Sequence, residues 1–202
     1  MQRIFFITIF VLLPVVFLQA QKQKVILLDD FSNNANKWPT VIGKMTNYLV
    51  YNGKLVINTD DTLTYTNSIP VDLNTQNNFS ITITATHTNG IDNSDYGLFF
   101  GASNLNNYIC YLISNNGFSR SYKIGDDGFV DILKWTENPA IKTGNYVDNV
   151  LRISKEGANW IFSVNGQSLA TVHALPFYGN KIGVLVSQNQ RIEFDDLKMI
   201  EY

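Results

Sequence analysis

Apolar and polar residues alternate along short segments of this chain, and a period of two is typical of a β-strand with one buried face. From Phe79 to Ala85 every second residue is apolar, and Ser or Thr fills the positions between. The segments around Leu151 and Trp160 alternate in the same way. We therefore expect these strands to place one face in a core and the other in water.

One segment departs from this alternation, because residues 108–113 are apolar at every position. Tyr108 and Cys110 fall on one face of the expected strand, and Ile109 and Tyr111 fall on the other. Such a strand is central in its sheet, and its second face is covered by loops, a partner or a ligand.

The dipeptide Asn-Gly occurs four times, starting at Asn52, Asn89, Asn116 and Asn165. Both residue types tolerate positive φ, which the two central residues of a type I′ turn require, and that turn joins paired strands. Strand-like runs flank three of the four pairs on both sides, so the sequence predicts three hairpins. The pair at Asn89 instead follows a strand and leads into a polar loop.

Other segments are rich in β-branched and aromatic residues, with turn residues between them roughly every ten residues. The further strands are expected at residues 24–31, 63–67, 96–101, 128–133, 150–155, 181–188 and 191–200. No window of useful length repeats apolar residues at helical spacing, and at most one short helical turn is expected, within residues 136–147. The pattern predicts an all-β sandwich or barrel.

The beginning of the chain follows a different pattern. Arg3 precedes an apolar run over residues 4–17, and Ala20 offers a small residue for cleavage. This is the pattern of a secretory signal peptide. The alternative is a membrane anchor, but the run is shorter than the ~20 residues that a bilayer requires and Pro14 interrupts it.

We therefore expect residues 1–20 to be a signal peptide and residues 21–202 to form a single β-sandwich domain. No second hydrophobic span follows, so we expect no membrane insertion after cleavage. The expected location is secreted, either extracellular or periplasmic.

Composition and motifs exclude several functions. The chain has 15 basic and 17 acidic residues, so no excess of positive charge attracts nucleic acid or an anionic membrane. Cys110 is the single cysteine, which prevents an internal disulfide, and it is expected to be a buried inert thiol. His87 and His173 are expected at the surface, and no nucleophile elbow, zinc motif or phosphate-binding loop accompanies them. No nucleotide or transition-metal cofactor is expected.

Several short motifs follow one another along the chain in a recognisable order. They read DDFSNNANKW, YNGKLVIN, YGLFFG, NNYICYLISNNGF, DILKWTENPAIKTG, DNVLRISKEGANWIFSVNGQSL, KIGVLV and IEFDDLKM. Their order resembles the concanavalin A-like jelly roll, and within it the secreted domains related to laminin G modules and to glucanase-like and keto-disaccharide-hydrolase-like domains. The resemblance implies two curved antiparallel sheets, adjacent first and last strands, and a concave face that often holds carbohydrate.

The glucanase branch of that superfamily carries its catalytic acids on one strand that reads E-x-D-x-x-E. The nearest match in this chain begins at Glu193 and Asp195, but Lys198 stands where the second glutamate is required. This departure argues against glucanase chemistry, and we expect no catalytic residue. A glycoside hydrolase with a different placement of its two carboxylates remains the alternative. Acids on separate strands are available for it: Asp95, Asp126, Asp127 and Asp131.

Aromatic residues offer the most plausible recognition surface, because sugars present flat C–H faces with polar rims. Trp135 ends a predicted strand before a long polar loop, and Tyr96, Tyr108, Arg120 and Tyr122 lie on neighbouring predicted strands. We expect these five residues to contact a glycan or another cell-surface ligand in a non-catalytic binding module. A structural or adhesive protein without a small ligand is the further alternative.

The other two tryptophans, Trp38 and Trp160, are assigned to the core. The resemblance also implies a structural calcium where the first and last strands meet, and Asp30 and Asp195 are its candidate ligands, since Ca²⁺ prefers clustered oxygen donors. The alternative is that these acids cap turns or accept backbone hydrogen bonds. No other cofactor is expected, and the sequence does not specify an oligomeric state.

Overall fold

The structure, a computed structural model, describes residues 23–202. The expected signal peptide at residues 1–20 lies outside this part of the chain. Residues 23–202 contain no helical segment with the length and hydrophobicity of a membrane span.

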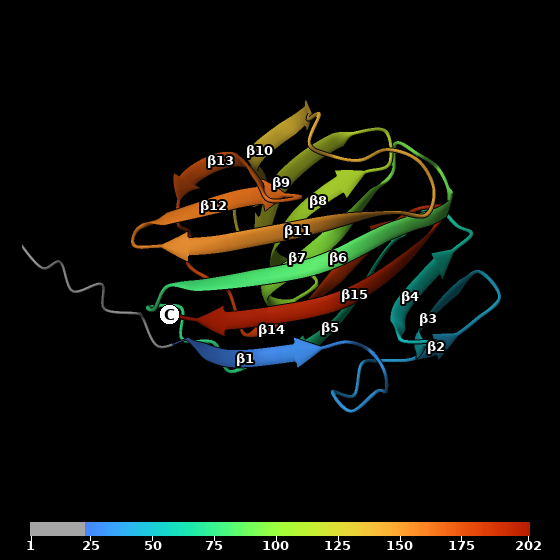
Figure 1. The fold of residues 1–202 in the computed structure, drawn as a ribbon, viewed down its shortest axis with the longest axis horizontal. Coiled ribbons are helices and arrows are strands. Elements are labelled where there is room, and N and C mark those ends of the chain that lie inside the picture. Colours follow the sequence, from blue (N-terminus) through green and yellow to red (C-terminus); the bar gives the residue numbers. More distant parts are fainter. Residues whose placement is uncertain (1–22) are drawn as a thin grey trace, which may run out of the picture.

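Fifteen strands within residues 23–202 form two antiparallel sheets that pack face to face (Figure 1). The nine-stranded sheet runs in the order β13 (Gln167–His173), β12 (Asn159–Val164), β11 (Val147–Glu156), β6 (Phe79–Gly90), β15 (Gln190–Glu201), β4 (Lys54–Thr59), β3 (Thr46–Tyr51), β2 (Val41–Ile42), with β1 (Lys24–Asp29) on β15. The six-stranded sheet runs in the order β10 (Gly128–Glu137), β9 (Phe118–Gly125), β8 (Asn107–Ser114), β7 (Asp95–Asn104), β14 (Lys181–Ser187), β5 (Thr64–Pro70). The all-β sandwich expected from the sequence is confirmed.

The core lies between the two sheets and takes side chains from both. The alternating apolar residues from Phe79 to Ala85 all point into it and have no exposed surface. Trp38 and Trp160 are 2% and 1% exposed, as expected for core residues. Alternation therefore identified the inward-facing side chains of these strands correctly.

Two of the three predicted hairpins have type I′ turns. Asn52 and Gly53 join β3 to β4 with φ values of 50° and 71°, and Asn165 and Gly166 join β12 to β13 with 49° and 80°. The hairpin of β8 and β9 also forms, but among its turn residues only Gly117 has a positive φ, 93°. Its loop has three residues, in which a left-handed glycine completes the turn.

The turn at Gly166 provides a test of the third hairpin. Gly166→Val is expected to lower the free energy of unfolding by about 1–2 kcal/mol, because a β-branched residue resists a positive φ. A Cβ added at Gly166 would meet no atom within 4 Å, so the loss comes from the backbone alone. Urea unfolding measures it, and Gly166→Asn, which tolerates this φ, is the control with the smaller loss. Equal stability of wild type and the valine variant would contradict the turn.

Residues 136–147 contain no helix, which agrees with the expectation of at most one short helical turn there. Residues 138–146 form an irregular loop that asparagine side chains hold in place. Asn138 Oδ1 accepts the N–H of Ala140 at 2.9 Å, and the Asn149 side chain bonds both the N–H and the C=O of Lys142, each at 2.9 Å. These side-chain bonds, together with one backbone bond from Ile141 N to Asn138 O at 3.1 Å, hold the loop.

The outer face of the six-stranded sheet, which points away from the nine-stranded sheet, carries a second apolar cluster. It contains Phe99, Ala102, Tyr108, Cys110, Leu112, Tyr122 and Leu185, all from that sheet. The strand at residues 108–113 is thus buried on both faces, as its sequence predicted. Burial raises the pKa of the Cys110 thiol, which agrees with an inert residue.

Four connections meet at one end of the sandwich, on the right in Figure 1, and we call this end the loop end. It consists of residues 91–94, 115–117, 138–146 and 188–189. Asn116 N donates to Asp92 O at 3.0 Å, Ile91 N to Asn189 O at 3.0 Å, and Asn115 Nδ2 to Asn145 Oδ1 at 3.4 Å. The four connections are therefore held against one another.

His87, near this end of β6, has no exposed surface, and its Nδ1 lies 2.8 Å from Asn145 Oδ1. The expected surface position of His87 is wrong, because His87 continues the inward-facing alternation of β6 and its ring centroid lies 6.1 Å from that of the core residue Tyr96. His173 at the end of β13 is exposed, as expected.

Candidate functional site

A hollow of about 500 Å³ opens on the outer face of the six-stranded sheet at the loop end. We call it the Trp135 hollow. Five of its residues lie on strands β5, β7, β9, β10 and β14, so it crosses most of the sheet. Its lining consists of Thr64, Asn93, Ser94, Asp95, Arg120, Trp135, Ser187 and Gln188.

An ion pair stands at the centre of the Trp135 hollow. Arg120 on β9 donates from Nε to Oδ2 of Asp95 on β7 at 2.7 Å, and its Nη2 donates to the same oxygen. Asp95 is 6% exposed, whereas the Arg120 side chain keeps 30% of its surface exposed. Since a guanidinium carries five N–H groups, Arg120 retains donors for a ligand after it has neutralised Asp95.

Aromatic rings enclose the guanidinium of Arg120. Its Cζ lies 4.7 Å from the centroid of the Tyr122 ring and 5.3 Å from that of Trp135. Trp135 on β10 also stacks on Phe118, with centroids 5.9 Å apart and ring planes 14° apart. Trp135 is 39% exposed, so this packing fixes the orientation of its ring and leaves surface available for a ligand.

Hydroxyl and amide groups complete the Trp135 hollow. The hydroxyl groups of Thr64 and Ser187 lie 3.2 Å apart on paired strands. Beneath them, the buried Gln190 of β15 donates from Nε2 to the carbonyl oxygen of Asp95 at 3.0 Å, which ties this backbone to the other sheet. The arrangement offers both donors and acceptors beside an aromatic platform, the combination that suits a polyhydroxylated ligand.

No protein-family model matches this sequence. No curated protein sequence matches it either. Solved structures do match. A carbohydrate-binding module, CBM66 from Bacillus subtilis, has a TM-score of 0.61 at 14% identity, over 82% of this chain and 95% of the module.

The catalytic domain of an endo-1,3-β-glucanase (laminarinase) from Thermotoga petrophila RKU-1 has a TM-score of 0.61 at 10% identity, over 90% of this chain and 99% of that domain. The CBM2 module of the evolved Dit of Lactobacillus casei BL23 phage J-1 has a TM-score of 0.61 at 12% identity, over 89% and 96% of the two chains. The fold is a concanavalin A-like jelly roll. These identities show the fold of the chain and not its activity, because both binding modules and catalytic domains use this fold.

The jelly roll brings four of the five expected ligand-binding residues together on one face. Arg120 and Trp135 line the hollow, and Tyr108 and Tyr122 lie beside them on the same face. The two tyrosines are only 8% and 5% exposed, and burial raises the pKa of each phenol. They therefore support the guanidinium and the apolar cluster more than they offer surface to a ligand.

Tyr96 does not join this face. It follows Asp95 directly on β7, so alternation sends its side chain to the opposite face, where it is fully buried in the core. Its ring centroid lies 6.1 Å from that of His87. Tyr96 therefore does not line the hollow.

Sequence reasoning missed most polar residues of the Trp135 hollow. The sequence indicates Asp95 only as a possible acid, and it does not distinguish Thr64 and Ser187 from other polar strand residues. Alternation along the expected strand at residues 181–188 places Ser187 on the same face as Leu185, but no local pattern indicates that Thr64 pairs with it. Asn93, Ser94 and Gln188 lie in connections, where no periodic pattern indicates the direction of a side chain.

The first and last strands of the jelly roll are paired, as the resemblance implies. The two candidate acids for calcium each have a partner within the protein. Asp195 pairs with Lys54 of β4, and Asp30 accepts the N–H of Ser32 at 3.0 Å, which lowers the pKa of Asp30. Residues 23–202 contain no group of three or more His, Cys, Asp or Glu side chains that could hold a metal ion. The structural calcium stays a prediction.

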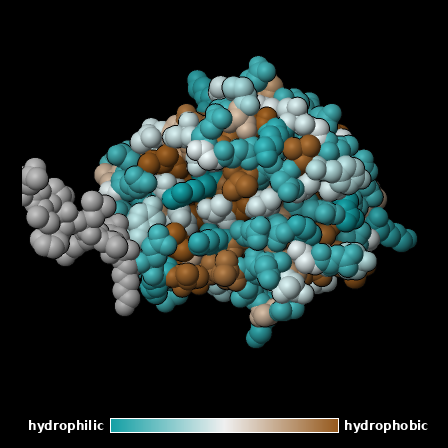
Figure 2. All heavy atoms as spheres, in the orientation of Figure 1, coloured by the Kyte–Doolittle hydropathy of each residue, from teal (hydrophilic) through white to brown (hydrophobic). Residues whose placement is uncertain are grey.

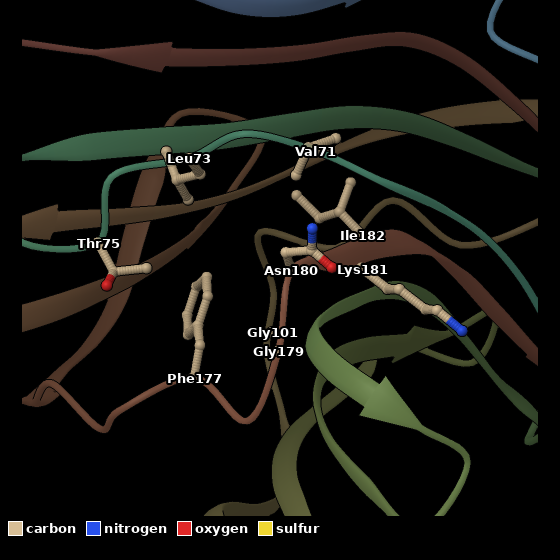
Figure 3. A pocket seen from close by; sticks show the side chains of 9 residues that line it. All are labelled: Val71, Leu73, Thr75, Gly101, Phe177, Gly179, Asn180, Lys181 and Ile182. Carbon is tan, nitrogen blue, oxygen red and sulfur yellow. The ribbon is translucent and has the colours of Figure 1, made fainter.

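A smaller pocket lies near the opposite end of the jelly roll (Figure 3). Its volume is about 40 Å³, and the side chains of Val71, Leu73, Phe177 and Ile182 surround it. A space of this size holds a few water molecules and no sugar ring. The Trp135 hollow is therefore the better candidate site.

Proposed function

We propose that this protein is a non-catalytic module that binds carbohydrate in the Trp135 hollow. The observation that carries the proposal is the exposed Trp135 ring, held at a fixed angle beside the partly exposed Arg120. An aromatic ring can stack on the C–H face of a sugar, and the guanidinium and the neighbouring hydroxyl and amide groups can bond its hydroxyl groups. A flat outer face of the six-stranded sheet, without a hollow, would have favoured a purely structural role.

The acids of the hollow favour binding over hydrolysis. Glycoside hydrolysis uses two carboxyl groups about 5–10 Å apart, one of them protonated. Among the residues that line the Trp135 hollow, Asp95 is the single carboxylate, and Arg120 neutralises it. Glu193 lies on β15, in the other sheet. A hydrolase would need a second acid, and none is among the residues that line the hollow.

We also propose that the module acts outside the cytoplasm after removal of residues 1–20. The basic, apolar and small-residue segments of the leader support export. A glycan in the extracellular space or the periplasm would then be the partner.

Trp135→Ala tests the proposal. The variant is expected to lose retention on a glycan array at least tenfold, because it removes the stacking platform of the hollow. Tyr51→Ala is the matched control, since Tyr51 is an exposed aromatic residue, 57% exposed, that lines no part of the hollow. Wild-type protein that binds no glycan on the array would refute carbohydrate binding. Binding that survives in Trp135→Ala would refute the assigned site.

A further inference from the structure

A second hollow, of about 600 Å³, opens at the same loop end but on the nine-stranded sheet. We call it the Tyr146 hollow. Hydrophilic residues predominate on this face over the beginning of β15 and the end of β6, on the right in Figure 2. The hollow is lined by Thr88, Asn89, Asn145, Tyr146, Arg191 and Glu193.

The backbone at Tyr146 is strained in a way that exposes its ring. Tyr146 has a φ of 62°, a left-handed conformation that is an outlier for a bulky side chain, and it is 77% exposed. Its N–H donates to the carbonyl oxygen of His87 at 2.8 Å, and Asn145 beside it contacts the His87 ring. The loop thus holds an aromatic ring out in solvent at a conformational cost that core packing does not explain.

An ion pair also lines the Tyr146 hollow, as another does in the Trp135 hollow. Arg191 Nη2 donates to Glu193 Oε1 at 2.8 Å, and both side chains come from β15. The side chains are 39% and 26% exposed, so each offers surface to a ligand. The two hollows therefore share one composition: an exposed aromatic ring, an arginine paired with an acid, and amide or hydroxyl groups.

A polar rim joins the two hollows around the loop end. A further depression on this rim is lined by Asp92, Asn115, Asn116, Thr143, Gly144 and Asn145. It shares Asn145 with the Tyr146 hollow, and Asp92 directly precedes Asn93 of the Trp135 hollow. Asn115 Nδ2 donates to Asp92 Oδ1 at 2.6 Å, so this rim is ordered by its own hydrogen bonds.

From this continuity we infer that the Tyr146 hollow is a second sugar-binding subsite, and that the ligand is an extended oligosaccharide that crosses the rim between the two hollows. The inference rests on the proposed function, because it assigns the same chemistry to a second surface. A disaccharide occupies the Trp135 hollow alone. A longer chain gains the Tyr146 ring and the Arg191 guanidinium as additional contacts.

The test compares short and long ligands. Immobilised disaccharides and hexasaccharides of β-glucan, xylan, mannan, galactan and fructan are presented to wild type, Tyr146→Ala and Arg191→Ala. Wild type is expected to bind the hexasaccharide of its preferred glycan at least tenfold more tightly than the disaccharide. Each variant is expected to lose most of this gain and to keep the disaccharide affinity.

Control variants distinguish the loss of the Tyr146 ring from a loss of folding stability. Tyr146→Phe keeps the aromatic face and is expected to retain most of the length dependence. Tyr146→Asn is expected to unfold at the same or a higher temperature than wild type, because asparagine tolerates a positive φ, while it loses the length dependence. Tyr51→Ala controls for removal of an exposed tyrosine elsewhere.

The outcomes separate this inference from the proposed function. Wild type that binds none of these glycans, nor any on the wider array, refutes carbohydrate binding and the subsite with it. Glycan binding with unchanged length dependence in Tyr146→Ala overturns the subsite and leaves the Trp135 hollow intact. Equal losses for disaccharide and hexasaccharide in Tyr146→Ala overturn it as well, because they indicate one site.

Discussion

Replacing Arg120 by alanine is expected to lower the free energy of unfolding by about 3 kcal/mol and to abolish glycan retention. Asp95 is 6% exposed, and Arg120 is the partner of its carboxylate, so the variant leaves a buried negative charge without compensation. The guanidinium also separates the rings of Tyr122 and Trp135, which lose their common contact. Urea unfolding followed by tryptophan fluorescence measures the first effect, and a glycan array measures the second.

A second substitution separates the effect of the buried charge on stability from the effect of Arg120 on glycan retention. In the Arg120→Ala background, Asp95→Asn removes the uncompensated charge, so it is expected to restore most of the stability without restoring retention. Stability of Arg120→Ala within about 0.5 kcal/mol of wild type would show that water reaches Asp95 and that the pair is a surface contact.

Trp160→Ala is expected to cost about 4 kcal/mol of unfolding free energy, because it leaves a large cavity in a core that cannot fully collapse. Trp160 is 1% exposed, and its ring meets those of Phe100, Phe162 and Phe177, with centroids 5.8, 6.4 and 5.9 Å away. These rings come from both sheets and from the connection that precedes β14. The loss is measured by equilibrium unfolding in urea.

Trp160→Phe is the matched control for that cavity. The indole Nε1 of Trp160 is buried without a hydrogen-bond partner, so phenylalanine removes an unsatisfied donor together with part of the ring. The expected loss is below about 1.5 kcal/mol. Equal losses for the two variants would contradict the cavity explanation, because phenylalanine fills part of the space that alanine leaves empty.

Local sequence patterns predicted the strands well, because each depends on a short stretch of chain. The alternation from Phe79 to Ala85 identified a one-sided strand, and the Asn-Gly pairs at Asn52 and Asn165 located tight turns whose φ values are positive at both positions. These signals involve only a residue and its near neighbours. They therefore do not depend on how the two sheets pack.

The geometry of the Trp135 hollow could not be predicted in the same way. The register of β10 on β9 shifts twice, since Asp131 pairs with Tyr122 and Thr136 with Ser119. Such bulges break the period of two, so the sequence did not show that Trp135 would lie beside Arg120. The polar loop expected after Trp135 is present at residues 138–146, but its path could not be predicted, because asparagine side chains hold it and no periodic pattern indicates such bonds.

The antiparallel pairing of β1 with β15 determines how the molecule can be attached to a support. Lys24 lies opposite Glu201, and both are at the far end of the sandwich from residues 91–94 and 188–189 (Figure 1). A tether or a fused neighbouring domain that continues from Tyr202 therefore departs on the side away from the two hollows. An anchored copy would hold the loop end, with both hollows, away from its support.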